Sequence, residues 1–104
     1  MEIRVTEVNA RDEITIRTKF SEYSFCVTDP VQCRGFLSGG QLGNEPHDAF
    51  FAGAIPPAGS KPCESTRFET GHRAVFLVSG DGVNRLTTSI ITEIKLSETP
   101  VEVC

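Results

Sequence analysis

The stretch HRAVFLVSGDGVNRLTTS, residues 72–89, carries the clearest structural signal in the chain. Two runs rich in apolar and β-branched residues flank the letters GDG, which are typical of the turn of a β-hairpin. If Asp81 and Gly82 form the loop, Leu77 is expected opposite Leu86. The run AVFLV is apolar at consecutive positions, so it predicts a central strand that is covered on both faces.

The segments before and after this hairpin show the same β-type pattern. Residues 22–28 place Tyr23, Phe25 and Val27 on one face of a strand and smaller or polar side chains on the other. No segment has a convincing helical period. Further strands are expected around Ile3 and Val5, around Ile14 and Ile16, and over residues 34–40, 49–55 and 89–96.

These strands predict an all-β fold in a single domain that spans residues 1–104. About five to seven short antiparallel strands with regular turn signals are typical of a small barrel or a compact sandwich, and we favour an SH3-like barrel. One segment interrupts the pattern, because residues 53–71 contain Pro56, Pro57 and Pro62, and proline removes hydrogen-bond donors from a sheet. A long Pro/Gly-rich loop is therefore expected there, and loops of this length tend to be functional or disordered.

The charge and the apolar pattern argue against two classes of partner. The 104 residues include 10 basic and 14 acidic residues, a net charge of −4, and the basic residues are scattered singly. Nucleic-acid binding calls for a basic patch or stripe, so no nucleic-acid partner is expected. The N-terminal letters MEIRV do not fit a signal peptide, and no apolar run approaches the length of a membrane span. We therefore expect no membrane partner and a cytoplasmic location, in which thiols stay reduced.

Two of the four cysteines, Cys26 and Cys33, flank an Asp-Pro turn. A loop of about four residues built on a type I turn sets Phe25 opposite Phe36 and makes the two cysteines diagonal neighbours. Diagonal Cβ atoms lie roughly 7–8 Å apart, whereas a disulfide requires about 3.8 Å. No disulfide between these two cysteines is expected.

A metal site built from Cys33, His47 and Cys63 is an alternative hypothesis. Zinc modules present such ligands in close pairs, of the C-x-x-C or H-x-x-x-H kind, and the chain has no such pair. We therefore favour buried cysteines that act as small apolar side chains, and we predict no metal and no other cofactor. No catalytic residue is predicted either, because His47 and Asp48 are adjacent and point to opposite faces of a strand.

Two features favour binding. The Pro-rich loop combines a stiff Pro-Pro pair with two cationic side chains, and long loops on a rigid scaffold often carry binding sites. The adjacent phenylalanines at positions 50 and 51 cannot both face the core of a strand, so a second layer or a partner is expected to cover one of them. The candidate binding residues are Phe50, Phe51, Pro56, Pro57, Lys61 and Arg67.

Eight scattered residues fit a recognisable pattern, which runs from a Tyr through an Asp-Pro turn and a Gly-Gly-ended strand to a Thr-Ser-x-x-x-x-Ile close. They are Tyr23, Asp29, Pro30, Gly39, Gly40, Thr88, Ser89 and Ile94. Through these residues the chain resembles a loose group of small bacterial proteins of unknown function. The resemblance implies a small β-barrel and brings no activity, cofactor or catalytic residue with it.

Three hypotheses for the function remain open. The leading one is a non-enzymatic small β-barrel that acts as a binding or assembly module, with an unknown protein partner or with a second copy of itself. The second is a metal- or thiol-dependent protein that uses Cys33, His47 and Cys63. The third is a small-ligand carrier or minor enzyme with its site at the barrel mouth, which requires a concave pocket with converging polar groups.

Overall fold

A computed structural model describes residues 2–59, 61, 63, 65–80 and 82–97. These residues form nine strands and two short 3-10 helices, labelled η. In chain order they are β1 (Glu2–Arg4), η1 (Val5–Glu7), β2 (Glu13–Thr18), β3 (Glu22–Asp29), β4 (Arg34–Gly39), η2 (Gly40–Leu42), β5 (His47–Ile55), β6 (Arg67–Glu69), β7 (Arg73–Gly80), β8 (Gly82–Thr87) and β9 (Ile91–Ser97). Within the described ranges, no helix has the length and apolar character needed to cross a bilayer.

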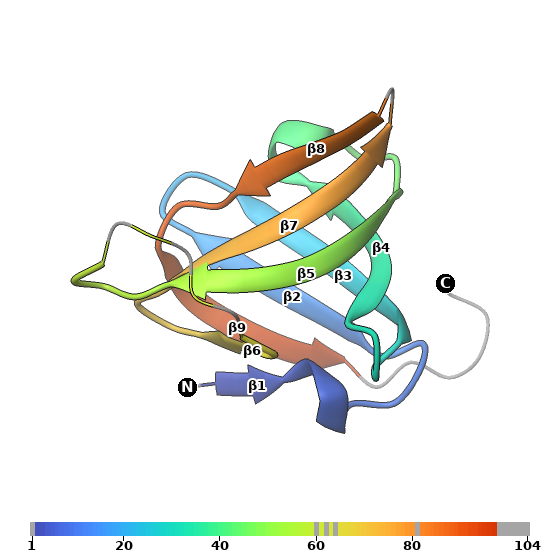
Figure 1. Ribbon diagram of the computed structural model, residues 1–104, viewed down its shortest axis with the longest axis horizontal. Helices are drawn as coiled ribbons and strands as arrows, with labels where there is room; N and C mark the ends of the chain where they lie inside the picture. Colours follow the sequence, from blue (N-terminus) through green and yellow to red (C-terminus); the bar gives the residue numbers. More distant parts are fainter. Residues whose placement is uncertain (1, 60, 62, 64, 81, 98–104) are drawn as a thin grey trace.

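Seven of the strands form one antiparallel sheet in the order β8-β7-β5-β4-β3-β2-β9, and β1 pairs with β6 in a separate two-stranded sheet. The large sheet curls so strongly that β5, β7 and β8 lie in front of β2 and β3 (Figure 1). The radius of gyration of 12.4 Å is close to the value of about 13 Å expected for a compact domain of this length. The all-β prediction is confirmed. The large sheet does not close into a barrel, because β8 and β9 end the sheet order as its two outer strands. The SH3-like arrangement stays a prediction.

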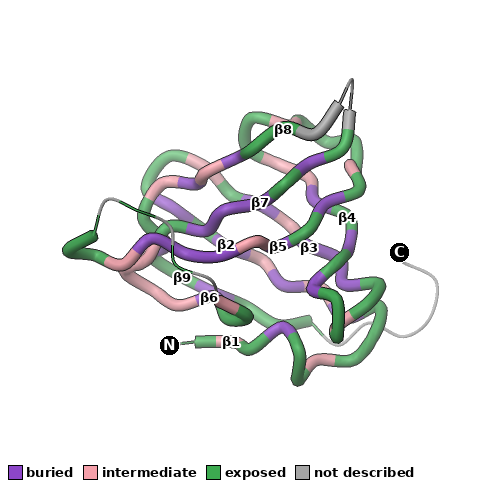
Figure 2. Tube along the Cα trace, viewed as in Figure 1, coloured by how far each residue is buried: buried purple, intermediate pink, exposed green. Residues whose placement is uncertain are grey.

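The inner face of the curled sheet carries the core, which appears as the buried positions that recur along the strands in Figure 2. Phe68 of β6 lies at its centre: its ring stacks on Phe51 with centroids 4.2 Å apart and lies 5.8 Å from Phe76 and 6.0 Å from Phe25. Aromatic pairs at these distances add to the free energy gained from burial. The two-stranded sheet therefore contributes a core residue and closes the open side of the large sheet.

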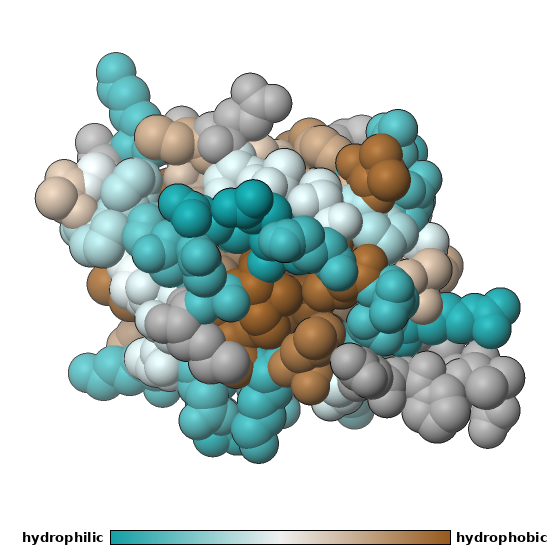
Figure 3. All heavy atoms as spheres, turned by 90° about the horizontal axis from the view of Figure 1, so that it is seen from below, coloured by the Kyte–Doolittle hydropathy of each residue, from teal (hydrophilic) through white to brown (hydrophobic). Residues whose placement is uncertain are grey.

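On that open side, part of the apolar surface stays visible. Seen from below, hydrophobic side chains gather at the centre of the face, with hydrophilic ones around them (Figure 3). Strands β1, β6 and β9 lie on this side of the molecule (Figure 1). Ile3 and Val8 pack against the core while only partly buried, and Leu96 of β9 is exposed. The small sheet thus covers the core here without sealing it.

The hairpin of β7 and β8 forms where it is predicted, but its register differs by one residue. Leu77 pairs with Arg85 instead of Leu86, and Phe76 pairs with Leu86. A shift of one residue moves every side chain of a strand to the other face. In the observed register the buried Leu86 joins the buried Phe76 on the inner face, so core packing decides the register. The predicted loop residue Asp81 lies outside the described residues.

The predicted double cover of β7 holds only in part. Ala74, Val75, Phe76 and Val78 are buried, whereas Leu77 is 37% exposed on the outer face. The strand lies between β8 and β5 within the sheet. Ala74, Phe76 and Val78 belong to the core cluster, whereas on the other face Val75 is buried and Leu77 is not.

The hairpin of β3 and β4 also has a different register from the predicted one. Phe25 pairs with Leu37 rather than Phe36, and Cys26 pairs with Phe36. Phe25 and Leu37 are both fully buried, so this register again joins core residues. The predicted absence of a bond between Cys26 and Cys33 is confirmed, because Cys33 is a free thiol.

Strand β9 has a β-bulge in its pairing with β2, and this bulge turns its apolar residues toward the core. Arg17 pairs with Glu93 and Thr18 pairs with Ile91, so Thr92 is an extra residue in β9. A β-bulge of this kind changes which residues share a face. It lets Ile91 and Ile94, three positions apart, both lie buried on the inner side.

Candidate functional site

The outer face of the large sheet carries an unusual row of apolar side chains. Phe50 pairs with Leu77, and Phe36 lies on the neighbouring strand β4. Phe36, Phe50 and Leu77 are 39%, 38% and 37% exposed, although the outward positions of a one-sided sheet are normally polar. We call these three residues the outer apolar surface. Phe51, the chain neighbour of Phe50, is 1% exposed in the core, so the prediction that one of the two faces outward is confirmed.

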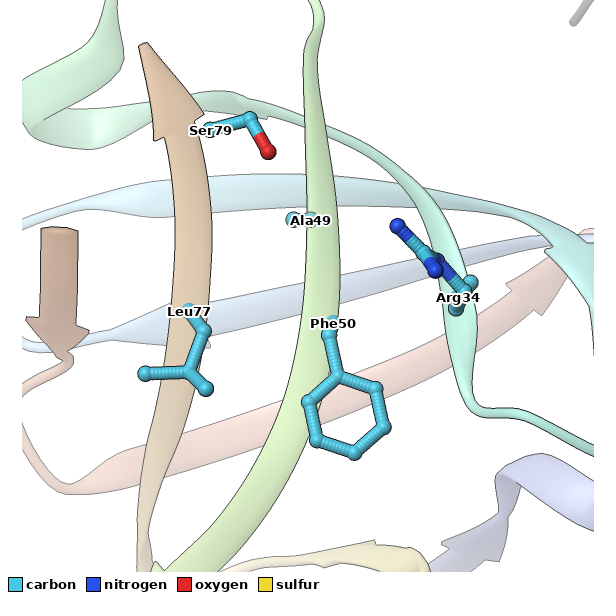
Figure 4. A pocket seen from close by; sticks show the side chains of 5 residues that line it. All are labelled: Arg34, Ala49, Phe50, Leu77 and Ser79. Atoms are coloured by element: carbon cyan, nitrogen blue, oxygen red, sulfur yellow. The ribbon is translucent and has the colours of Figure 1, made fainter. Parts of the chain in front are cut away.

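Charged side chains flank this surface on both sides. Arg34 pairs with Phe50 in the sheet, and its Nη2 atom lies 3.5 Å from Oδ2 of Asp48. In Figure 4 the ring of Phe50 lies between the side chains of Leu77 and Arg34. On the other side, Leu77 pairs with Arg85, which has no ion-pair partner in the part of the chain that the structure describes. Across the strands, the outer face therefore carries Arg34, Phe50, Leu77 and Arg85 in a row, with a cation at each end.

Two hollows extend the outer apolar surface. A shallow pocket of about 190 Å³ is lined by Arg34, Ala49, Phe50, Leu77 and Ser79 (Figure 4). A second groove, of about 370 Å³, lies at Phe36 and continues the surface toward β2 and β3. It is lined by Glu13, Ser24, Cys26, Phe36, Ser38, Asn44 and Pro46.

The candidate residues of the Pro-rich loop are divided by the structure. Pro56 and Pro57 line a groove at the end of β5, together with Ile55, Arg73 and Ile90. Lys61 is exposed. Arg67 lies on β6, where its Nη1 atom donates a hydrogen bond of 2.8 Å to Glu2 and its Nε atom lies 3.8 Å from Glu69. Arg67 and Pro56 line a further hollow of about 160 Å³ together with Cys63, Glu69 and His72. Lys61 lines neither this hollow nor the groove at Pro57.

The long loop itself is only partly within view, since residues 60, 62 and 64 lie outside the described residues. Cys63 is tied back to the sheet, because its backbone exchanges hydrogen bonds of 2.7 and 2.9 Å with Ala54 of β5. Its free thiol is exposed.

The three proposed metal ligands do not come together. His47 pairs with Leu37 at the start of β5, whereas Cys63 pairs with Ala54, seven residues further along the same strand. Seven residues of a strand span roughly 23 Å, far beyond any metal-ligand distance. Among the described residues, no three His, Cys, Asp or Glu side chains are grouped so that they could hold a metal ion.

Cys33 is a buried thiol in the turn between β3 and β4. Burial raises its pKa, and the carboxylate of Asp29 raises it further. Both effects disfavour the thiolate, which is the form that binds metals and attacks electrophiles. Cys33 is therefore suited to packing rather than to chemistry.

The two histidines occupy different settings. His47 lines a depression of about 270 Å³ at the upper end of the curled sheet, beside Gln41 of η2 and Asn84 of β8. Its neighbour Asp48 belongs to the outer face, where it contacts Arg34. His72 precedes β7, its Nε2 atom lies 3.8 Å from Glu69, and its buried Nδ1 has no hydrogen-bond partner in the described structure.

Comparison of the chain with family models, with curated proteins and with solved structures found no match. The resemblance to small bacterial proteins therefore stays a prediction.

Proposed function

We propose that this protein is a non-enzymatic binding or assembly module that associates through its outer apolar surface. One observation carries the proposal: Phe36, Phe50 and Leu77 are adjacent on three strands and more than a third exposed. Contiguous apolar side chains of this kind, with polar residues around them, mark interaction sites. Aromatic residues, phenylalanine among them, and arginine are enriched at protein interfaces.

The charges beside the surface favour a second copy of the chain as the partner. Arg34 and Asp48 lie on the same face next to Phe50. In a two-fold symmetric contact the same patch meets itself, so Arg34 of one copy can face Asp48 of the other. Two copies that meet through the outer apolar surface could therefore exchange the Arg34–Asp48 pair that lies beside it.

The test is the molar mass of the wild type and of two variants by light scattering over a range of concentrations. Wild-type protein should show a mass that rises toward a dimer, and Phe50→Ser should stay a monomer. Phe20→Ser is the matched control, because Phe20 is 77% exposed but lies in the turn between β2 and β3. A monomeric wild type at every concentration, or a monomeric Phe20→Ser, would contradict self-association through this face.

A further inference from the structure

The proline groove is a second concave site, separate from the outer apolar surface. It lies where the end of β5, the start of β7 and the link between β8 and β9 meet, and its volume is about 260 Å³. This volume is close to the lower limit of about 300 Å³ for pockets that hold small molecules. The groove is lined by Ile55, Pro56, Pro57, Gly59, Gly71, Arg73 and Ile90.

Its walls are held by backbone hydrogen bonds. The Gly59 N–H donates to the Pro56 carbonyl at 3.0 Å and closes a turn around Pro57. On the opposite wall the Gly71 N–H donates to the Ile91 carbonyl at 2.8 Å, and the Ile91 N–H donates to the His72 carbonyl at 2.9 Å. These bonds hold Ile91 and His72, which are chain neighbours of Ile90 and Arg73. A site that is shaped in advance binds with a smaller entropy cost.

Gly71 supplies the backbone conformation of the wall that faces Pro57. Its φ of +88° lies in the left-handed region that favours glycine. A Cβ at this position would lie 3.7 Å from Pro57 Cγ, an ordinary contact distance, so the positive φ and not the space between the walls calls for glycine.

The lining is apolar except for one cation. Arg73 pairs with Ile55 across β5 and β7, so their side chains share a face. Four other arginines each contact a carboxylate, namely Arg4, Arg17, Arg34 and Arg67. Arg73 has no such partner among the residues that the structure describes, and no described lining residue is acidic. The exposed Arg73 guanidinium is therefore available to pair with the negative charge of a ligand.

We propose that the proline groove binds a small organic acid, in which an aliphatic or aromatic group packs between Pro57 and Ile90 and the carboxylate pairs with Arg73. Arginine presents parallel N–H donors that match a carboxylate, and a charge-assisted hydrogen bond is stronger than a neutral one. The apolar walls account for the rest of the molecule. This site goes beyond the proposed association through the outer apolar surface and does not depend on it.

The test is a titration of the full chain with hexanoate and, separately, with hexanol, followed by the amide shifts in two-dimensional nitrogen–proton NMR spectra. Saturable shifts at Ile55, Gly59, Gly71 and Ile90 are expected with hexanoate. The affinity for hexanol should be lower by a factor of about ten or more, because hexanol lacks the charge-assisted hydrogen bond to Arg73. Arg73→Gln should weaken hexanoate binding by a similar factor and leave hexanol binding unchanged.

Two matched variants separate the parts of the site. Arg85→Gln removes another arginine without an ion pair, at β8, and should leave both titrations unchanged. Ile90→Ser should weaken both ligands, because it removes apolar contact and not charge. Equal binding of hexanoate and hexanol, no effect of Arg73→Gln, or shifts that do not saturate would overturn the proposal. Tighter binding of a short peptide with a free C-terminal carboxylate would overturn the assignment to a free small acid.

Discussion

The two faces of the curled sheet share the same strands and differ in what they do. Phe50 and Phe51 are neighbours in β5, yet Phe50 is 38% exposed and Phe51 is 1% exposed. On the inner face, Phe51 contacts Phe68 and Phe76 within an aromatic cluster. On the outer face, Phe50 lies between Leu77 and Arg34 and contributes surface rather than core. We infer that the inner face determines stability and the outer face determines association, and each of the following changes tests that division.

The largest effect is expected from Phe76→Ala on the inner face. Phe76 is fully buried and its ring lies 5.3 Å from Phe25 and 5.5 Å from Phe51. Truncation leaves a cavity and should lower the free energy of unfolding by about 3–5 kcal/mol. Phe50→Ala, the outer-face control, should cost about 1 kcal/mol or less. Urea unfolding measures both, and equal losses would break the division between the faces.

A smaller effect is expected from Thr88→Val, which removes a buried hydroxyl. The Ala74 N–H donates to Thr88 Oγ1 at 3.0 Å, and that hydroxyl donates to the Ser89 carbonyl at 2.8 Å. Loss of the hydroxyl should cost about 1–3 kcal/mol of unfolding free energy, because buried polar groups lose a partner. Thr92→Val is the matched control, since its hydroxyl donates to the Arg17 carbonyl at an exposed position. Thermal unfolding should give a clearly lower melting temperature for Thr88→Val than for this control.

The cysteines extend the comparison to reactivity and pH. Cys63 is exposed and Cys33 is buried, so iodoacetamide should modify Cys63 first, as mass spectrometry of digested protein would show.

The pKa of Cys33 is raised in the folded protein, whereas an unfolded cysteine ionises near pH 8.5. The unfolded state therefore loses this proton first, and the free energy of unfolding should fall as pH rises above about 8.5.

The control for this pH effect is a pair of variants. Cys33→Ala should flatten the alkaline fall in stability, and Cys63→Ala should leave it as in the wild type. An unchanged slope in Cys33→Ala would show that other groups cause the fall.

The smallest effect on stability is expected from Arg34→Gln on the outer face. The Arg34 and Asp48 side chains are 54% and 49% exposed, and an ion pair in such a setting contributes about 1 kcal/mol or less. Chemical denaturation should barely distinguish this variant from the wild type. The self-association constant should fall more clearly if Arg34 faces Asp48 of a second copy, and light scattering would measure it.

Prediction from the sequence succeeded where a local pattern was enough. The alternation of Tyr23, Phe25 and Val27 identified the inner face of β3, and the exposure of one residue of the Phe50–Phe51 pair followed from strand geometry alone. Both predicted hairpin registers were wrong by one residue, because core packing between distant strands decides the pairing. Local patterns indicate where the strands lie, whereas the pairing of the strands depends on the whole fold.

The sites show the same limit. Pro56 and Pro57 were predicted as binding residues, but Arg73 and Ile90 were not, since the groove forms only when three separate segments meet. The sequence does place Arg73 at the start of a predicted strand and Ile90 in an isoleucine-rich segment. Nothing in the sequence indicates that these two residues line the same groove until the strands are paired. The proposed metal ligands do not meet, because His47 lies at one end of β5 and Cys63 pairs near the other end. Cys33 lies in the turn between β3 and β4, where its carbonyl accepts a hydrogen bond from Phe51.

The pairing of β1 with β6 has a consequence for the order of folding. Ile3 pairs with Phe68, and a hydrogen bond joins Glu2 to Arg67, 65 positions apart in the chain. Closing so long a loop is slow and costs entropy, whereas the hairpins of the large sheet join near neighbours. Strand β9 also pairs with β2 across a long loop, as Glu13 with Ser97. We therefore expect the hairpins of the large sheet to form first, and β9 and the N-terminal strand to dock later. Pulsed hydrogen exchange during refolding should then protect the amides of β1 and β6 after those of β3 and β7, and simultaneous protection would show that the N-terminal strand belongs to the folding nucleus.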